Sequence, residues 1–591
     1  MASNIQDLQN NIAEAIAEGF RNDLLARGQS RSMIWRDGAL PEDAPEYSEY
    51  LSHDLFSYAY ALLSQGLRLV ELQGDPAVAR AAFEHAAESI EAAIVRSADN
   101  PERDFHRVVA AASYHLGHFS ARAYSLLRAS VTEPNLSLPE RSLAKLMLRD
   151  LDGLSEDIAA WKRAGSGSDE ALIGVLKSSQ DDDLEAEDRE SRLIEAFNLV
   201  LNEDFLSALA TALLALERGD SPLIEEAVRK LTVGLGSAAE LNLVAQWWCH
   251  RLTIHLLRDL WDMSFHHRLP ELGPPEGTAD AWPELRRLFI SSLYRRQKSE
   301  IELWPSQLRA ASRVLEFEAN LVLSLPTSAG KTRIAELCIL ACLATGMRVV
   351  FVTPLRALSA QTEAGLQRTF HPLGKTVSSL YGSIGASSAD VDALRSRDIV
   401  VATPEKLDFA LRNEPALLDD VGLIVLDEGH MIGLNEREVR YEAQIQRLLK
   451  RGDAATRRIV CLSAILPEGD QLEDFVDWLT SDKPGGLIKD KWRPTRLRYG
   501  EVEWIGDHAQ LTVSVGDEKP WIRKFLTAKR PPNGKRTKPF PNDQRELCLA
   551  TAWRLVDDGQ TVLIFCPRRV SVLPFAEAIV DLHSRGRRLS R

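Results

Sequence analysis

The feature that most constrains the fold is a short apolar run that passes directly into a turn containing glycine and lysine. The run starts at Leu321 and continues into Leu325-Pro-Thr-Ser-Ala-Gly-Lys-Thr332, after which the pattern is helical. A strand, a turn ending in Gly-Lys-Thr and a helix, in this order, match the second half of a phosphate-binding P-loop. Leu325 stands where that loop usually has its first glycine.

Similar apolar runs recur along the chain after residue 320. They cover residues 348–353, 398–402, 423–426 and 458–462, and helical stretches lie between them. Near-continuous apolar strands that alternate with helices predict a parallel sheet with helices on both faces. Ligands of such sheets bind at the carboxyl ends of the strands, so we expect the functional residues there.

The turn after the first strand has the chemistry to hold a triphosphate. Gly330 lets the backbone wrap around a phosphate, and N–H groups at the start of the helix point toward the anion. Lys331 would reach the β- and γ-phosphates, and the Thr332 hydroxyl would bind Mg²⁺. The predicted nucleotide-binding residues of the turn are Thr327, Ser328, Ala329, Gly330, Lys331 and Thr332.

A second motif places two acids at the end of an apolar strand. It reads Leu423-Ile-Val-Leu-Asp-Glu-Gly-His430 and follows the turn by about 95 residues. Asp427, at the strand tip, would anchor Mg²⁺ through water. Glu428 would orient and deprotonate the attacking water. Together the two motifs predict hydrolysis of a nucleoside triphosphate.

The second motif resembles the DExH box of superfamily 2 helicases. Other segments resemble further helicase motifs, in the family's order: Trp304–Gln307 (glutamine motif), Thr353–Leu358 (motif Ia), Thr403–Lys406 (motif Ib), Ser463–Ile465 (motif III) and Thr561–Pro567 (motif IV). Arg437-Glu-Val-Arg-Tyr-Glu442 and Trp492-Arg-Pro494 are similar to the superkiller-like branch, which includes DNA- and RNA-unwinding members.

This resemblance implies an ATP-dependent helicase or translocase with ATP and Mg²⁺ as cofactors. It implies that Gln307 reads adenine, that Arg356, Thr403 and Lys406 face single-stranded DNA or RNA, and that Ser463 couples hydrolysis to the strand. The catalytic residues that it implies are Lys331, Asp427, Glu428 and His430, and its Mg²⁺ ligands are Thr332 and Asp427. Ile465 replaces the threonine of motif III, which puts the strength of that coupling in doubt.

The first half of the chain is different in texture. Ala, Leu, Glu and Arg dominate residues 1–295, and apolar residues recur at three- and four-residue spacing. We expect an all-α domain over residues 1–290, divided into two sub-bundles by a loop near 165–190. A RecA-like domain over 296–483, a connecting segment over 484–545 and the start of a second RecA-like domain over 546–591 would follow.

The charge and the cysteines exclude some classes of protein. A net charge of −14 excludes a simple basic nucleic-acid coat. From Pro484 onward, however, 21 Lys and Arg outnumber 12 Asp and Glu, so a local basic path remains. Six cysteines without a CxxC pair exclude a disulfide scaffold and disfavour a structural zinc site. Without a signal-peptide pattern at residues 1–11, we expect a cytoplasmic protein with no membrane contact.

Two functions stay open at this level. Motifs V and VI of the family are absent, so we expect this chain to be C-terminally incomplete and to hydrolyse ATP poorly alone. The alternative is a helical binding or regulatory subunit of a bacterial, antiviral defence-type complex, with the ATPase completed in trans or degenerate. The helical domain would then recruit a protein partner. The sequence leaves open DNA versus RNA, the unwinding polarity, the partner and the oligomeric state.

Overall fold

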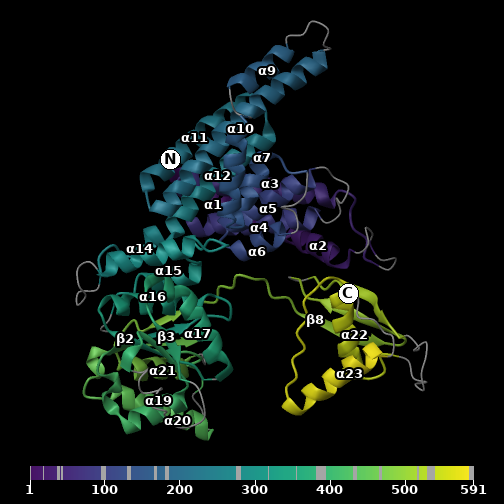
Figure 1. Cartoon of the computed structure of the whole chain (residues 1–591). Coiled ribbons are helices and arrows are strands. Elements are labelled where there is room, and N and C mark those ends of the chain that lie inside the picture. The colour runs from purple at the N-terminus through teal and green to yellow at the C-terminus, as the bar shows by residue number, and fades with distance from the viewer. Residues whose placement is uncertain are drawn as a thin grey trace. The chain divides into compact units, whose positions relative to one another are not determined.

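The computed structural model of the chain (Figure 1) consists of two units. One is Arg107–Thr495, and the other combines Met1–His106 with Arg496–Arg591. The division therefore falls inside the range predicted as a single helical domain. The structure describes all residues except 1, 18, 36–39, 41–43, 95–101, 129–134, 166–168, 180–185, 274–280, 317–318, 355, 381–394, 430, 432–434, 465–468, 516–517, 529–539 and 585–591.

The unit Arg107–Thr495 contains the predicted parallel sheet. Its strand order is β3-β4-β2-β5-β6-β1-β7, and every neighbouring pair is parallel. The strands are β1 (Leu321–Ser324), β2 (Arg348–Val352), β3 (Val377–Ser379), β4 (Ile399–Ala402), β5 (Val421–Leu426), β6 (Arg458–Ser463) and β7 (Leu487–Lys489). The five predicted strands are confirmed to within two residues, whereas β3 and β7 were not expected. Both are three-residue edge strands, too short to show an apolar period.

Each strand sends alternate side chains to opposite faces, so the sheet supports two cores. Val349 and Phe351 belong to one core, together with apolar side chains of the helices α14 to α17. Val350 and Val352 belong to the other, with side chains of α19 to α21. These helices are α14 (Ala281–Tyr294), α15 (Pro305–Ala311), α16 (Lys331–Ala344), α17 (Arg356–Phe370), α19 (Pro404–Asn413), α20 (Glu436–Leu449) and α21 (Asp470–Thr480).

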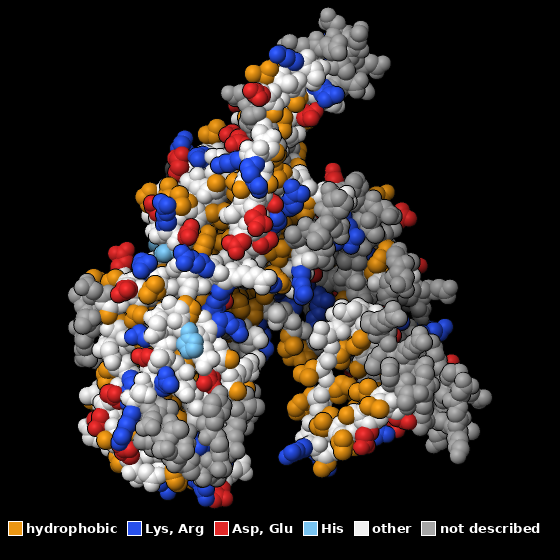
Figure 2. Space-filling view, in the orientation of Figure 1, with side chains coloured by type: hydrophobic (Ala, Val, Ile, Leu, Met, Phe, Trp, Pro, Cys, Tyr) orange, Lys and Arg blue, Asp and Glu red, His pale blue; other side chains and the backbone are white. Residues whose placement is uncertain are grey.

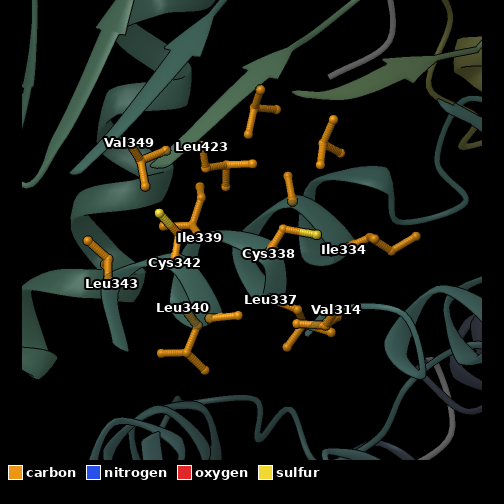
Figure 3. Close-up of a cluster of buried hydrophobic side chains, with 14 of the residues drawn as sticks. Val314, Ile334, Leu337, Cys338, Ile339, Leu340, Cys342, Leu343, Val349 and Leu423 are labelled. Carbon is orange, nitrogen blue, oxygen red and sulfur yellow. The ribbon is translucent and has the colours of Figure 1, made fainter. Parts of the chain in front are cut away.

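Helix α16 follows the phosphate turn and lies deepest in the unit. All its residues from Ile334 to Ala344 are buried, since the sheet covers one side and α14 and α15 cover another. Figure 3 shows Cys338 and Cys342 among apolar neighbours on this helix, with Val349 and Leu423 of the sheet beside them. The two thiols are therefore core residues.

The rest of this unit is helical, which confirms the all-α texture read from the sequence. Helices α9 and α10 pack on each other, and α10 also packs on α11 and α12. Residues 189–218 of α10 are long and apolar enough to cross a membrane, but half of the apolar stretch is buried in the bundle. The helices are α5 (Arg103–Leu116, which begins in the other unit), α6 (Ser120–Leu127), α7 (Leu138–Met147), α8 (Leu151–Arg163), α9 (Asp169–Ser179), α10 (Ala186–Arg218), α11 (Ser221–Glu240), α12 (Val244–Met263) and α13 (Phe265–Arg268).

The other unit joins helices from the start of the chain to a sheet from its end. Ile34 of α2 lies in one apolar cluster with Ile522 and Phe525 of the antiparallel sheet β10-β9-β8. This sheet lies in the range predicted as a connecting segment. The elements are α1 (Ala2–Ile16), α2 (Phe20–Ile34), α3 (Leu51–Glu71), α4 (Pro76–Ile94), β8 (Gly500–Ile505), β9 (His508–Val513), β10 (Trp521–Thr527), α22 (Gln544–Asp557) and α23 (Val572–Ser584).

The segment 561–567, expected to be the first core strand of a second RecA-like domain, is not a strand in the structure. Ile564 packs against α22 and α23, while Leu563 and Phe565 are 93% and 84% exposed. Figure 2 shows hydrophobic side chains on the surface of this C-terminal part. A strand needs a hydrogen-bonded neighbour, and the described residues supply none for this segment.

Candidate active site

The parallel sheet brings the predicted motifs together at one edge. The strands β2, β5, β6 and β1 are consecutive neighbours, and each passes into a predicted motif at its carboxyl end. Backbone hydrogen bonds continue past the strand ends, from Asp427 N to Val352 O (2.9 Å) and from Leu325 N to Ser463 O (3.1 Å). The residues that the sequence places about 95 positions apart are therefore close in space.

The turn before α16 has the backbone shape of an anion-binding loop. Ser328 and Gly330 both have left-handed conformations, with φ of 69° and 82°. Such a backbone turns successive N–H groups inward, which suits a phosphate. Leu325, which replaces the usual glycine, has no positive φ, and its side chain is buried in the core beneath the sheet. The position needs no glycine here, because its φ is not positive and the side chain packs in the core.

Lys331 points back over its own loop. Its Nζ donates to the carbonyl oxygens of Leu325 (3.1 Å) and Pro326 (3.3 Å). Burial lowers the pKa of Lys331, although Glu428 and Asp427 act to raise it. The ammonium group therefore lies against the carbonyl groups of its own loop and interacts electrostatically with both acids of the second motif. This arrangement suits a triphosphate and its metal.

Residues of the glutamine motif hold the phosphate turn in place. The Ser306 hydroxyl donates to Ala329 O (2.7 Å), and Gln307 Nε2 donates to Gly330 O (3.0 Å). Gln307 Oε1 in turn accepts from the backbone N–H of Trp304 (2.7 Å). A side-chain amide has two N–H groups and two lone pairs, so Gln307 keeps one of each for a nucleotide base. Sequence reasoning missed Ser306, whose only signal is its place between Pro305 and Gln307.

The acidic turn after β5 is held by close backbone approach. Glu428 has a left-handed φ of 51°, and its N–H donates to Asp427 Oδ1 (3.0 Å). Gly429 N donates to Leu462 O (2.9 Å) of the neighbouring strand. A Cβ on Gly429 would lie 2.1 Å from Cys461 Sγ, so any other residue there requires Cys461 to shift. The turn thereby holds Asp427 and Glu428 at the strand end, while His430 lies outside the described residues.

The predicted nucleic-acid contacts are less open than expected. Thr403 and Lys406 are each only 6% exposed, and Thr403 Oγ1 accepts from Lys406 N (3.4 Å) as the N-cap of α19. Arg356 is the first residue of α17, but its side chain lies outside what the structure describes. Beside these motifs, Arg437 Nε donates to Glu405 Oε1 (2.6 Å) and its guanidinium also bonds Pro354 O. Arg437 thus joins motif Ib to motif Ia.

Two further predictions concern Ser463, the expected coupling residue, and the ligands of Mg²⁺. Ser463 is fully buried at the end of β6, and Ile465 lies outside the described residues. Among described residues, no group of three or more His, Cys, Asp or Glu could hold a metal. Mg²⁺ does not require one, because it commonly uses one or two protein oxygens and takes phosphate and water for the rest. The Thr332 hydroxyl and the Asp427 carboxylate suit this role in their chemistry.

Comparison with known proteins agrees with this site. Residues 304–475 match the family described as DEAD/DEAH box helicase. The Hachiman protein HamB of Bacillus cereus is 30% identical over 352 residues, which cover 57% of this chain and 30% of HamB. The ATP-dependent DNA helicase Hel308 of Pyrococcus abyssi is 35% identical over 207 residues, covering 35% of this chain and 27% of Hel308.

Each of these two matches covers less than a third of the relative's own length. A solved structure of the DUF1998 helicase MrfA bound to DNA aligns with a TM-score of 0.30 and 20% identity, over 38% of this chain and 31% of that one, which is too low to indicate a shared fold. The family match and the Hel308 matches agree with the order of motifs along the sheet edge. The chain therefore carries a helicase domain of the superfamily 2 DExH type.

Proposed function

We propose that the protein hydrolyses ATP and couples hydrolysis to movement along, or unwinding of, a nucleic acid. The observation that carries this proposal is the position of Lys331 in its loop. There the ammonium group interacts electrostatically with Asp427 and Glu428, which follow β5. Lys331 would bind the β- and γ-phosphates, and Glu428 would orient and deprotonate the attacking water. Gln307 would hydrogen-bond the adenine through the second N–H of Nε2 and the second lone pair of Oε1, which Gly330 and Trp304 do not use.

Mg²⁺ would be held by Thr332 and Asp427 together with phosphate oxygens. When bound, it would neutralise charge on the β- and γ-phosphates. The surrounding turn then has the task of holding the carboxylates of Asp427 and Glu428 at the strand end. Its glycine, Gly429, allows the backbone to approach β6 closely enough to do so.

For the nucleic acid we propose a single strand, and DNA before RNA. The Hel308 relatives are named as DNA helicases, which supports DNA. Arg356, Thr403 and Lys406 are the proposed backbone contacts. Because Thr403 and Lys406 are nearly buried, we expect the start of α19 to contribute more than these side chains. Ser463 would couple this surface to hydrolysis. The order of motifs and the Hel308 matches support the superkiller-like branch.

An ATPase assay with and without single-stranded DNA and RNA tests this function. We expect the chain alone to hydrolyse ATP slowly, nucleic acid to stimulate hydrolysis, and Lys331→Ala or Glu428→Gln to abolish the stimulated rate. Lys450→Ala is the matched control, because Lys450 follows α20 and precedes β6, at the opposite edge of the sheet. Activity that survives both site variants would refute the assignment of these residues. Activity that no nucleic acid changes would refute the coupling.

A second candidate is a binding or regulatory subunit of a multiprotein, defence-type complex. The HamB match favours it, since that match covers 57% of this chain and so extends beyond residues 304–475. The projecting hairpin of α9 and α10 also carries exposed apolar side chains: Ile173, Leu176, Leu193, Ile194, Phe197 and Val200. Purification of the protein together with its bound partner would distinguish the candidates. Loss of the partner from the double variant Phe197→Ser, Val200→Ser, but not from the control Val233→Ser on α11, would support the second candidate.

A further inference from the structure

A cavity of about 590 Å³ lies where the helical bundle meets the glutamine motif. Its lining includes Ala121 and Tyr124 of α6 on one side, and Trp304, Gln307 and Gly330 on the other. All of these residues belong to the unit Arg107–Thr495. The volume falls in the range of about 300–1,000 Å³ that is usual for small-molecule sites.

The place of this cavity beside the phosphate turn suggests its occupant. Gly330 lines the cavity and immediately precedes Lys331, whose Nζ marks the proposed phosphate position. A nucleotide whose phosphates lie at the start of α16 must place its ribose and base next to that turn. Gln307, the proposed base reader, lines the same cavity. The base therefore has a preformed space directly beside its phosphates.

Polar contacts, most of them partly buried, join the two sides of the cavity. Arg149, which follows α7, forms an ion pair with Glu302 (2.5 Å), and each side chain is 12% exposed. Ser299 N donates to Arg149 O (3.1 Å). On the other side, Arg333 of α16 pairs with Glu300 and Glu336. Since these contacts join both sides of the cavity to neighbouring elements, we expect the cavity to keep its shape without a ligand.

The rings of Tyr124 and Trp304, with the Lys298 ammonium beside Tyr124, offer contacts to an aromatic ligand in the cavity. Tyr124 projects from α6, and the Lys298 ammonium lies 4.2 Å from the centre of its ring and bonds its hydroxyl. Trp304 lies against the phosphate turn, because a Cβ on Gly330 would be 3.3 Å from its indole ring. An aromatic surface with a neighbouring cation favours a flat, electron-rich ligand such as a purine.

From these positions we infer that α6 of the helical bundle supplies one wall of the nucleotide-base site, with Tyr124 and Lys298 as base-contacting residues. This inference rests on the proposed function, because it requires ATP in the phosphate turn. It adds that the bundle is part of the ATP site. Nucleotide binding would then act on the bundle directly through α6, and not by way of the nucleic-acid contacts.

Calorimetry on the full chain with Mg²⁺ tests the inference, using a non-hydrolysable ATP analogue and tripolyphosphate as ligands. We expect Tyr124→Ala to raise the Kd of the analogue about two- to tenfold, the effect of one lost aromatic or cation–π contact. Ala121→Trp fills the cavity and should weaken the analogue more than about tenfold, since a base can no longer enter. Neither variant should change the Kd of tripolyphosphate, which has no base.

The controls separate this inference from the proposed function. Tyr50→Ala alters a 71% exposed tyrosine outside the cavity and should change neither Kd, and thermal melting checks that every variant is folded. The inference is overturned if Ala121→Trp leaves analogue binding unchanged while Lys331→Ala abolishes it, or if Tyr124→Ala weakens both ligands equally. If the unaltered protein binds neither ligand, the proposed function itself has failed.

Discussion

Gln307 Nε2 donates a hydrogen bond to the carbonyl oxygen of Gly330 across 3.0 Å, so the side chain assigned to the base also holds the phosphate turn. The contact is tight, because a Cβ on Gly330 would lie 2.1 Å from the same Nε2 atom. The left-handed φ of 82° at Gly330 is what brings its carbonyl within reach. One hydrogen bond thus joins the proposed base-reading side chain to the proposed phosphate turn.

Gln307→Ala should therefore weaken binding of both the ATP analogue and tripolyphosphate. The change leaves Trp304 N without its printed partner, while Gly330 O keeps only the backbone N–H of Arg333 (3.1 Å). An unmade buried hydrogen bond costs about 1–3 kcal/mol, or about tenfold in Kd for each 1.4 kcal/mol. Calorimetry with the two ligands measures this. Gln361→Ala, at an exposed glutamine of α17, is the control. Unchanged tripolyphosphate binding would show that Gln307 does not support the turn.

Gly429→Ala should disrupt the acidic turn through one contact. The new Cβ would lie 2.1 Å from Cys461 Sγ, while the next nearest atoms are 3.7 Å or more away. Overpacking of this kind costs about 1–3 kcal/mol, and we expect ATP hydrolysis to fall as well because Asp427 and Glu428 move.

The double variant Gly429→Ala with Cys461→Ala removes the clashing sulfur atom and should recover most of the loss. Urea unfolding and the ATPase rate of the four proteins in this cycle measure the coupling. Cys461→Ala alone reports the cost of the lost sulfur. If the double variant is as impaired as Gly429→Ala, the close contact is not the reason for the glycine.

Phosphate binding should weaken at alkaline pH. Burial lowers the pKa of Lys331, despite the raising effect of Glu428 and Asp427, and the ammonium form is the one that binds phosphate. The proton is therefore lost at a lower pH than from an ordinary lysine, and the Kd of tripolyphosphate should rise before the pH reaches the ordinary lysine pKa of about 10.4. Lys331→Arg stays charged up to this pH and should show a flat profile. Equal slopes in both proteins would place the titration elsewhere.

His115 should reduce the acid stability of the fold. Burial, with Arg149 as the next contribution, lowers the pKa of His115 to about 3. The folded pKa lies below the ordinary value of 6.5, so the unfolded chain binds more protons between about pH 3 and 6.5, and stability is lost as the pH falls through this range. His115→Gln keeps an acceptor for Arg149 but cannot titrate.

The free energy of unfolding of His115→Gln, relative to that of the unaltered protein, should therefore rise as the pH falls below 6.5. Urea unfolding at several pH values measures this difference. His371→Gln, at an exposed histidine of the same unit, serves as the matched control. A constant difference between His115→Gln and the unaltered protein across this range would contradict the prediction.

Local pattern was sufficient for the core strands but not for the edges. The five central strands are continuous apolar runs because both of their faces are buried, and such runs are visible in the sequence. The edge strands β3 and β7 are three residues long, so they carry no clear apolar period. In β8, Val502 and Trp504 alternate with Glu501 and Glu503, a strand pattern that the prediction of a connecting segment missed. The segment 561–567 shows the converse: it has a strand-like sequence but no strand partner among the described residues.

The sequence by itself determined the chemistry of this protein: a Gly-Lys-Thr turn after one strand and an Asp-Glu pair after another, both at strand ends that a parallel sheet brings to one edge. These are local properties, because strand and helix periods and turn residues act over a few positions. Only the tertiary structure decided why Leu325 can replace a glycine, why Gly429 faces Cys461 and why Lys406 is nearly buried. It also placed α6 beside Gln307. Such contacts join residues that are not neighbours in the sequence, and packing decides them, since no local pattern specifies which surfaces meet.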